Sequence, residues 1–169
     1  MPSVNLIEGF QPKLLIFDEP FSGFDPINAN LIKDEILQLR DEGATVIFST
    51  HRMESVEELC DHIALIHRSN KVLDGKLTDI KRQFKTNTFE VGLQTDTADA
   101  VTNAIKEKFE VFPSTFRNLH DDVKLNIKLN ATDKSNDLLS FLTARAEVHH
   151  FVEVIPSAND IFIQTVKNN

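Results

Sequence analysis

The chain has 169 residues, of which 41% are hydrophobic, and its formal net charge is −8 at pH 7. This length suffices for one ordinary domain or two small ones, and it excludes a large multidomain enzyme. The acidic balance, with no run of Lys and Arg interleaved with aromatic residues, argues against a nucleic-acid surface or an anionic lipid surface.

The cysteine content and the apolar runs indicate where the chain resides. Its single cysteine, Cys60, excludes an internal disulfide framework and fits a reducing compartment, and we interpret it as a core thiol. No apolar run approaches the roughly 18 to 20 residues that span a bilayer, and the first residues lack the pattern of a signal peptide. We therefore expect a cytoplasmic protein.

A strand, a helix and a second strand are expected first along the chain. Residues 13–17, KLLIF, and 44–50, ATVIFST, are apolar runs typical of strands buried on both faces of a parallel sheet. Between them, residues 25–43 have helical spacing, with Asp25 as the N-cap and Gly43 as the stop. The order predicts a βαβ unit with parallel strands.

Three further elements are expected before residue 85: a short helix at 52–60, a hairpin at 62–75 that turns at Ser69-Asn70, and a helix at 76–84. The stretch that follows is more polar and changes pattern. We therefore place a domain boundary there, which gives domains at 1–84 and 85–169.

The second domain alternates strands and helices in a different order. The expected elements are a strand at 88–93, a helix at 97–109, a weaker strand at 110–112, a strand at 122–129, a helix at 137–146, a strand at 149–155 and a helix at 157–166. This order is close to βαββαβ plus a helix, which predicts an α+β sandwich of ferredoxin-like type. No paired carboxylates follow a strand here, so we interpret the domain as an interaction or regulatory module.

Polar residues follow the two strands of the first domain. Asp18 and Glu19 leave the first strand at its carboxyl end, and His51 leaves the second strand at the same end, where open parallel sheets bind ligands. Neighbouring strands lie about 4.8 Å apart, so these side chains should face one pocket. Carboxylates beside an apolar interior need a metal, a cation or water. Alternatively, the two acids only meet solvent at the strand end, and His51 is an ordinary polar residue that starts a helix.

Two segments resemble one known family. KLLIFDEPFSGFDP, residues 13–26, resembles the Walker B strand and D-loop of ATP-binding-cassette (ABC) ATPases. Residues 46–77, which begin VIFSTHRMESVEEL, resemble the switch-histidine strand and the hairpin after it. The resemblance covers residues 11–84 and implies an α/β fold that is the parallel-sheet half of a P-loop NTPase, followed by the small α+β domain.

The resemblance also implies roles for five residues. Asp18 would hold Mg²⁺ through its water shell, and Glu19 would orient or deprotonate the water that attacks ATP. His51 would contact the γ-phosphate and support Glu19. Ser22 and Asp25 would lie in the loop that meets a second ATPase subunit.

Two motifs of the ABC ATPases are missing from the chain. Neither a GxxxxGK[S/T] phosphate loop nor a Leu-Ser-Gly-Gly-Gln-like signature occurs among its 169 residues. The amides and lysine of the phosphate loop hold the triphosphate, so we expect this chain alone to bind ATP weakly or not at all. We also expect that residue 1 begins partway along a longer protein, because residues 4–10 resemble the end of a buried helix.

Residues 85–169 resemble the accessory domain that follows the ATPase core in bacterial exporter subunits of the sodium-extrusion and drug-resistance kind. The closing segment, EVIPSANDIFIQTV at residues 153–166, carries this resemblance.

Together these features predict the C-terminal part of the ATP-hydrolysing subunit of an export-type bacterial ABC transporter. The implied cofactors are ATP and Mg²⁺, and the implied partners are a membrane-spanning permease at the inner membrane and a second ATPase subunit, with no nucleic acid. Uncovered apolar faces predict that the fragment self-associates and is inactive alone. The alternatives are a stand-alone regulatory or binding protein with half an ATPase fold, and a soluble non-transport ABC ATPase.

Overall fold

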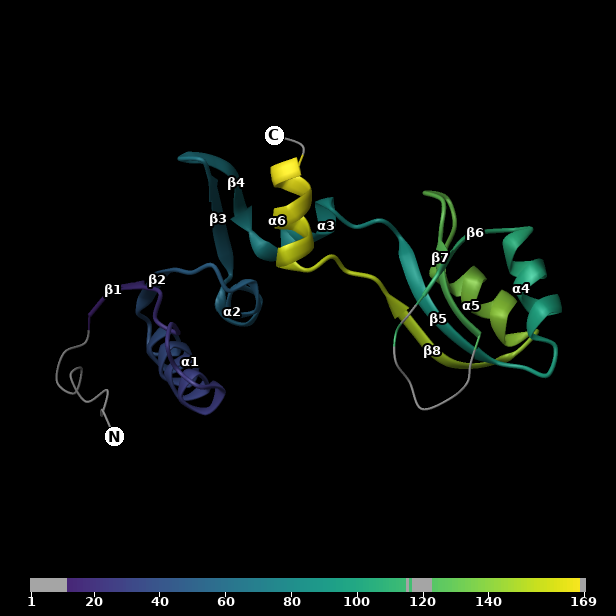
Figure 1. Ribbon diagram of the computed structural model, residues 1–169, viewed down its shortest axis with the longest axis horizontal. Helices are drawn as coiled ribbons and strands as arrows, with labels where there is room; N and C mark the ends of the chain where they lie inside the picture. The colour runs from purple at the N-terminus through teal and green to yellow at the C-terminus, as the bar shows by residue number, and fades with distance from the viewer. Residues whose placement is uncertain (1–11, 115, 117–122, 168–169) are drawn as a thin grey trace. The chain divides into compact units, whose positions relative to one another are not determined.

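The computed structural model describes residues 12–114, 116 and 123–167, and its contacts divide the chain into two units. The first unit runs to Thr78 and includes the segment from Ala158, while the second is Asp79–Ser157. Both units mix helices with small sheets (Figure 1). The helix end expected at residues 4–10 lies outside the described residues.

The first unit contains a parallel strand pair, an antiparallel hairpin and several helices. Its elements are β1 (Leu14–Asp18), α1 (Pro26–Asp41), β2 (Thr45–Ser49), α2 (Met53–Leu59), β3 (His62–His67), β4 (Asn70–Lys76), α3 (Leu77–Gln83), which continues into the second unit, and α6 (Ala158–Lys167). Every strand and helix expected between residues 12 and 84 is present, and so is the helix expected at 157–166.

The first two strands form the predicted βαβ unit. β1 pairs in parallel with β2, and the register runs from Leu14 opposite Thr45 to Asp18 opposite Ser49. α1 connects the two strands, as the sequence predicts. Because the strands are parallel and in register, the residues that follow them leave the sheet at the same edge.

Local sequence signals account for the start and end of α1. The Asp25 carboxylate accepts hydrogen bonds from the N–H groups of Ile27 (2.9 Å) and Asn28 (3.1 Å), and Pro26 occupies the first turn. Gly43 lies just beyond the helix with φ +102°, a conformation that glycine adopts without steric cost. The N-cap and stop predicted from the sequence are therefore confirmed.

Among the described residues, side chains cover one face of the parallel pair. On that face, Phe21, Ile36 and Leu59 are buried, and the ring of Phe21 meets that of Phe48 edge-on at a centroid distance of 5.7 Å. The opposite face carries three apolar side chains that are exposed by half or more: Leu14 (51%), Ile16 (71%) and Ile47 (53%). The expectation that these strands are buried on both faces is wrong for this structure, because α1 and the Phe21 loop cover one side.

The hairpin β3–β4 is antiparallel, with an irregularity between Leu65 and Ile66. Arg68 and Ser69 have positive φ, 47° and 63°, in the turn that joins the strands. α6 contacts α2 and β4, and its first residue, Ala158, donates its N–H to the carboxylate of Glu57. Those contacts group α6 with the first unit, whereas the sequence boundary after residue 84 groups it with the second domain.

Apart from the end of α3, the described residues of the second unit form a four-stranded antiparallel sheet and two helices. Its own elements are β5 (Thr88–Gln94), α4 (Ala98–Lys106), β6 (Glu110–Pro113), β7 (Val123–Lys128), α5 (Ser135–Thr143) and β8 (Glu147–Glu153). The strands are ordered β6-β7-β5-β8, and every neighbouring pair is antiparallel (Figure 1). The βαββαβ order expected from the sequence is therefore present.

Both helices of the second unit cover the same face of its sheet. Alternate residues of the central strand β5, Phe89, Val91 and Leu93, are buried in one cluster with Ile105 of α4 and Leu138 of α5. The period-two burial in β5 and the helical spacing of the apolar residues in α4 and α5 explain why one core forms.

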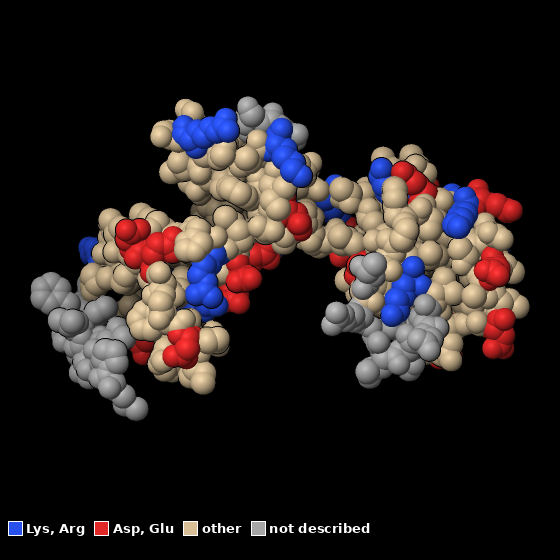
Figure 2. Space-filling model, in the orientation of Figure 1, with Lys and Arg blue, Asp and Glu red and all other residues tan. Residues whose placement is uncertain are grey.

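Charged side chains of both signs are interspersed on the face of the molecule drawn in Figure 2. Ion pairs within the second unit include Lys85 with Glu153 at 2.7 Å and Lys128 with Glu110 at 3.2 Å. The pair between Lys128 and Glu110 is exposed, and such pairs contribute little to stability. Among the described residues, no helix combines the length and apolarity needed to cross a bilayer.

Candidate functional site

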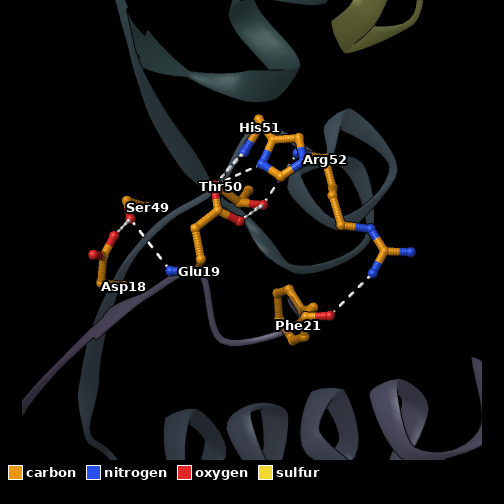
Figure 3. Close-up of polar contacts among 7 residues, drawn as sticks. All are labelled: Asp18, Glu19, Phe21, Ser49, Thr50, His51 and Arg52. Atoms are coloured by element: carbon orange, nitrogen blue, oxygen red, sulfur yellow. Dashed lines mark hydrogen bonds and ion pairs between the residues drawn. The ribbon is translucent and has the colours of Figure 1, made fainter. Parts of the chain in front are cut away.

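The polar residues that follow β1 and β2 meet at one edge of the parallel pair (Figure 3). Asp18 lies opposite Ser49 in the register, and the Ser49 hydroxyl donates a hydrogen bond to Oδ1 of Asp18. One residue further on, the N–H of Glu19 donates to the carbonyl oxygen of Ser49 at 3.1 Å. The pairing of the strands thus continues to Glu19 and fixes it beside residues 49 to 51.

The backbone of Glu19 turns sharply at this point. Its φ is 45°, in the left-handed region that non-glycine residues rarely adopt, and its carbonyl oxygen accepts the N–H of Ser22 at 3.0 Å. Such conformations persist where surrounding contacts hold them, and they cluster at functional sites. The turn lets the Glu19 side chain reach the residues that follow β2.

Three donors hold the Glu19 carboxylate. Oε1 lies 2.7 Å from Nδ1 of His51 and accepts the main-chain N–H of His51 at 3.1 Å, while Oε2 accepts the Thr50 hydroxyl at 3.2 Å (Figure 3). The hydrogen bond from the His51 side chain is the largest of the effects that lower the pKa of Glu19 below its ordinary value. Glu19 is therefore ionised at neutral pH.

The imidazole of His51 links Glu19 to solvent. Its side chain is 79% exposed, whereas that of Glu19 is 33% exposed. Because the ionised carboxylate can only accept, Nδ1 carries the hydrogen in this contact. The rest of the ring is open to a ligand that approaches the end of the sheet.

Asp18 is the residue here best suited to a hard cation. Its side chain is exposed, and carboxylate oxygens are the ligands that Mg²⁺ prefers. Among the described residues, no group of three or more His, Cys, Asp or Glu side chains could hold a metal. A single carboxylate fits Mg²⁺, which keeps several waters and takes one or two protein carboxylates together with substrate phosphates.

Ser22 and Asp25 lie in the loop between β1 and α1, and both are exposed. The hydrogen bonds that Asp25 accepts, first from the N–H of Asn28 and also from its side chain, lower the pKa of the Asp25 carboxyl. The Asp25 carboxylate is therefore engaged in starting α1, whatever else the loop contacts.

Sequence reasoning overlooked three residues of this site: Ser49, Thr50 and Arg52. Ser49 and Thr50 bind the two acids, and the Arg52 guanidinium donates from Nη1 to the carbonyl oxygen of Phe21 at 3.2 Å (Figure 3). Two adjacent hydroxyl residues at the end of the second strand could have been identified from the sequence as part of the site, because the parallel register of β1 and β2 places them beside Asp18 and Glu19.

The comparisons with known proteins show which family the chain belongs to. Residues 75–166, more than half of the chain, match the family model described as "ATP-binding protein DrrA1-3-like, C-terminal domain". The curated relatives that match include ABC transporter ATP-binding proteins over most of the chain. The chain therefore belongs to the DrrA1-3-like family of ABC transporter ATP-binding proteins.

Three relatives illustrate the similarity. The ABC transporter ATP-binding protein YhaQ of Bacillus subtilis is 35% identical over 92% of this chain and 49% of its own length. A second ABC transporter ATP-binding protein, from Alkalihalophilus pseudofirmus, is 35% identical over 92% of this chain and 55% of its own length. The linearmycin resistance ATP-binding protein LnrL of Bacillus subtilis is 32% identical over 83% of this chain and 43% of its own length. The chain thus spans about half the length of the relatives that it matches.

Proposed function

We propose that this chain forms the C-terminal part of the ATP-hydrolysing subunit of a bacterial export-type ABC transporter. The observation that carries the proposal is the contact between Glu19 and His51, an acid and an imidazole delivered by the ends of two neighbouring parallel strands. The similarity to a resistance ATP-binding protein supports the export assignment.

In this proposal, Glu19 orients the water that attacks the terminal phosphate. An ionised carboxylate offers about four acceptor positions, and three are used by Thr50 and His51, which leaves one for a water molecule. A general base works best with a pKa near the working pH. The lowered pKa of Glu19 therefore favours orientation of the water over early removal of its proton.

His51 and Asp18 bind the phosphates in this proposal. The exposed edge of the His51 ring contacts the γ-phosphate. Because Nδ1 already donates to Glu19, Nε2 donates to the phosphate when the ring carries both hydrogens, and such a donor stabilises the charge that develops during phosphoryl transfer. Asp18 holds Mg²⁺ through its water shell. The ion that Asp18 would hold would supply positive charge to neutralise the charge that develops on the phosphates.

The phosphate loop and the signature that the sequence lacks are supplied, in this proposal, by polypeptide outside these 169 residues. The chain alone is then inactive and binds Mg·ATP weakly. Isothermal calorimetry of the chain with Mg·ATP should show no micromolar binding, and a micromolar dissociation constant would contradict this part of the proposal.

We further propose two partners and a location. Ser22 and Asp25 face a second ATPase subunit, and the exposed Ser22 is the better placed for direct contact, because the Asp25 carboxylate already caps α1. A membrane-spanning permease holds the complete subunit at the cytoplasmic side of the inner membrane. In isolation, the chain self-associates with a second copy through the face formed by Leu14, Ile16 and Ile47.

For the second half of the chain, residues 85–169, we propose a ferredoxin-like accessory domain that follows an ATPase part at 1–84. The βαββαβ order and the antiparallel strand order β6-β7-β5-β8 support this assignment. The family model, which covers residues 75–166, supports treating this half as a C-terminal domain.

A chimera tests the proposed function. The segment of YhaQ that precedes its region of similarity is fused to this chain, and Mg·ATP hydrolysis is measured. We expect hydrolysis that Glu19→Gln lowers by about 10²- to 10⁴-fold, because the water loses its charged acceptor. Glu35→Gln, at an exposed position of α1, is the matched control and should leave the rate unchanged. A folded, inactive chimera would favour a stand-alone regulatory protein.

A further inference from the structure

Thr50 lies between the candidate catalytic acid and the start of α2. Its hydroxyl oxygen is 3.2 Å from Oε2 of Glu19 and 3.1 Å from the main-chain nitrogen of Arg52, and the residue is half-buried. Neither the family resemblance nor the sequence pattern assigns it a role.

The chemistry of the neighbours fixes the direction of both hydrogen bonds. A main-chain N–H can only donate, so the Thr50 hydroxyl accepts from Arg52. An ionised carboxylate can only accept, so the single hydroxyl hydrogen of Thr50 points to Glu19. The bond from Arg52 therefore orients the hydroxyl toward the acid.

The two oxygens of Glu19 are held by different residues. Both donors to Oε1 come from His51, whereas Oε2 is bound by Thr50. The terminal torsion of a glutamate side chain is broad, so donors at one oxygen leave the carboxylate plane free to rotate. Thr50 supplies the second point that defines this plane.

The bond network around Thr50 is anchored in the core. Arg52 also donates from its guanidinium to the carbonyl oxygen of Phe21, and the side chain of Phe21 is fully buried. Phe21 follows Glu19 by two residues, so the bonds Glu19–Thr50, Thr50–Arg52 and Arg52–Phe21 return to the same turn. This closed path ties the loop after β2 to the loop after β1 (Figure 3).

We propose that Thr50 is a positioning residue that fixes the plane of the Glu19 carboxylate, so that its remaining acceptor position faces the attacking water. The inference rests on the proposed ATPase function for its kinetic consequence. The contact that it describes, a Glu19 carboxylate held in place by the Thr50 hydroxyl, does not depend on bound nucleotide.

The geometric test uses the 169-residue chain without any added segment. Crystal structures of the wild-type chain and of Thr50→Val, which keeps the shape and removes the hydroxyl, are compared with that of Thr50→Ser. We expect Oε2 of Glu19 within hydrogen-bond distance of the residue 50 hydroxyl in the wild type and in Thr50→Ser, and a rotated or displaced carboxylate in Thr50→Val. A wild-type structure without this contact, or an unmoved carboxylate in Thr50→Val, would overturn the proposal.

The kinetic test uses the YhaQ chimera. We expect Thr50→Val to lower kcat by about 10- to 100-fold with little change in KM, because a small misplacement of a reacting group is that costly. Thr50→Ser should restore most of the lost kcat. Thr45→Val, the same change at an exposed position at the start of β2, is the matched control and should have no effect.

The outcomes separate the two proposals. An inactive wild-type chimera counts against the proposed function, and the crystal structures then decide the role of Thr50 alone. If the chimera is active and Thr50→Val leaves its kcat unchanged, the positioning role of Thr50 is wrong and the proposed ATPase function is unaffected. If Thr50→Val does not fold, the crystal structures of Thr50→Ala and of the wild type test whether the hydroxyl holds the Glu19 carboxylate.

Discussion

The Nδ1 atom of His51 lies 2.7 Å from the Oε1 atom of Glu19, although the two residues are 32 positions apart in the sequence. The same oxygen accepts the main-chain N–H of His51 at 3.1 Å. Residue 51 therefore contributes two donors to one carboxylate oxygen. Donors of this kind stabilise the ionised form of an acid, which explains the direction of the pKa shift at Glu19.

Replacement of His51 should weaken that stabilisation. We expect His51→Ala to raise the pKa of Glu19 toward its ordinary value of 4.5, because the hydrogen bond from the His51 side chain is the largest cause of the lowering. Carbon-13 NMR titration of the Glu19 carboxyl measures the change. If His51→Ala leaves the titration of Glu19 where it is in the wild type, the contact does not form in solution.

The sign of the linked stability follows from the lowered pKa. A carboxyl whose pKa is lower in the folded chain stabilises the fold at pH values above its unfolded pKa, and this contribution disappears as the pH falls through the folded pKa. Thermal unfolding measured from pH 7 downward should therefore lose less stability below pH 4.5 in His51→Ala than in the wild type.

A second prediction concerns the start of α1. Asp25→Ala removes the acceptor for the N–H groups of Ile27 and Asn28, and should lower the thermal midpoint by a few degrees. Asp25→Asn keeps an acceptor oxygen and should recover most of the loss at neutral pH. Circular dichroism of the two variants gives the comparison, and equal midpoints for alanine and asparagine would show that the cap does not stabilise the helix.

Much of the fold could be predicted because its signals are local. Asp25 and Gly43 mark the ends of α1 in the sequence, and the structure places the helix between them. The alternation of apolar residues in β5 and the spacing in α4 predict the second unit in the same way. Each signal lies within the element that it specifies, so no knowledge of distant contacts is needed.

The parts that could not be predicted depend on contacts between distant segments. An apolar run such as LLIF looks the same whether one or two faces are covered, so the exposure of Ile16 was missed. The acid pair and His51 were identified from their motifs, but Thr50 and Arg52 act through bonds to residues about 30 positions away. Their roles become visible only when the register of β1 and β2 is known.

The third prediction tests the core of the second unit. Leu138 is fully buried among residues of the sheet, so Leu138→Ala should lower the free energy of unfolding of this unit by about 2–5 kcal/mol. The adjacent Leu139 is only partly buried, so Leu139→Ala serves as the matched control and should cost less. Urea denaturation measures both values. A smaller loss at position 138 than at 139 would contradict the assignment of the core.

The fourth prediction concerns the only cysteine. Burial, and secondarily the charge of Asp61, raises the pKa of the Cys60 thiol to about 11. The reactive thiolate is therefore scarce at pH 7, and its fraction should rise about tenfold for each pH unit up to that pKa. Alkylation by a maleimide reagent at pH 7 should be slow in the folded chain and fast in urea. Equal rates in the folded and unfolded chain would show that the thiol is not protected.

The fifth prediction addresses the apolar face of the parallel pair. Ile16 and Ile47 are 71% and 53% exposed on one side of a two-stranded sheet, and such a surface favours association with a second copy. The double change Ile16→Lys and Ile47→Lys places charges on this face and should shift the chain toward the monomer mass of 19.2 kDa in light scattering. Little native packing is lost, because both side chains are already exposed.

The control for the apolar face is a similar change elsewhere in the same unit. Ile27 of α1 is 76% exposed and lies outside the strand pair, so Ile27→Lys adds one of the two charges of the double variant without altering that face. If Ile27→Lys lowers the mass as much as the double variant, net charge rather than this face controls association. If the wild-type chain stays monomeric at high concentration, the chain does not self-associate and this prediction is wrong. An effect confined to the double variant would identify the face of β1 and β2 as the contact between copies.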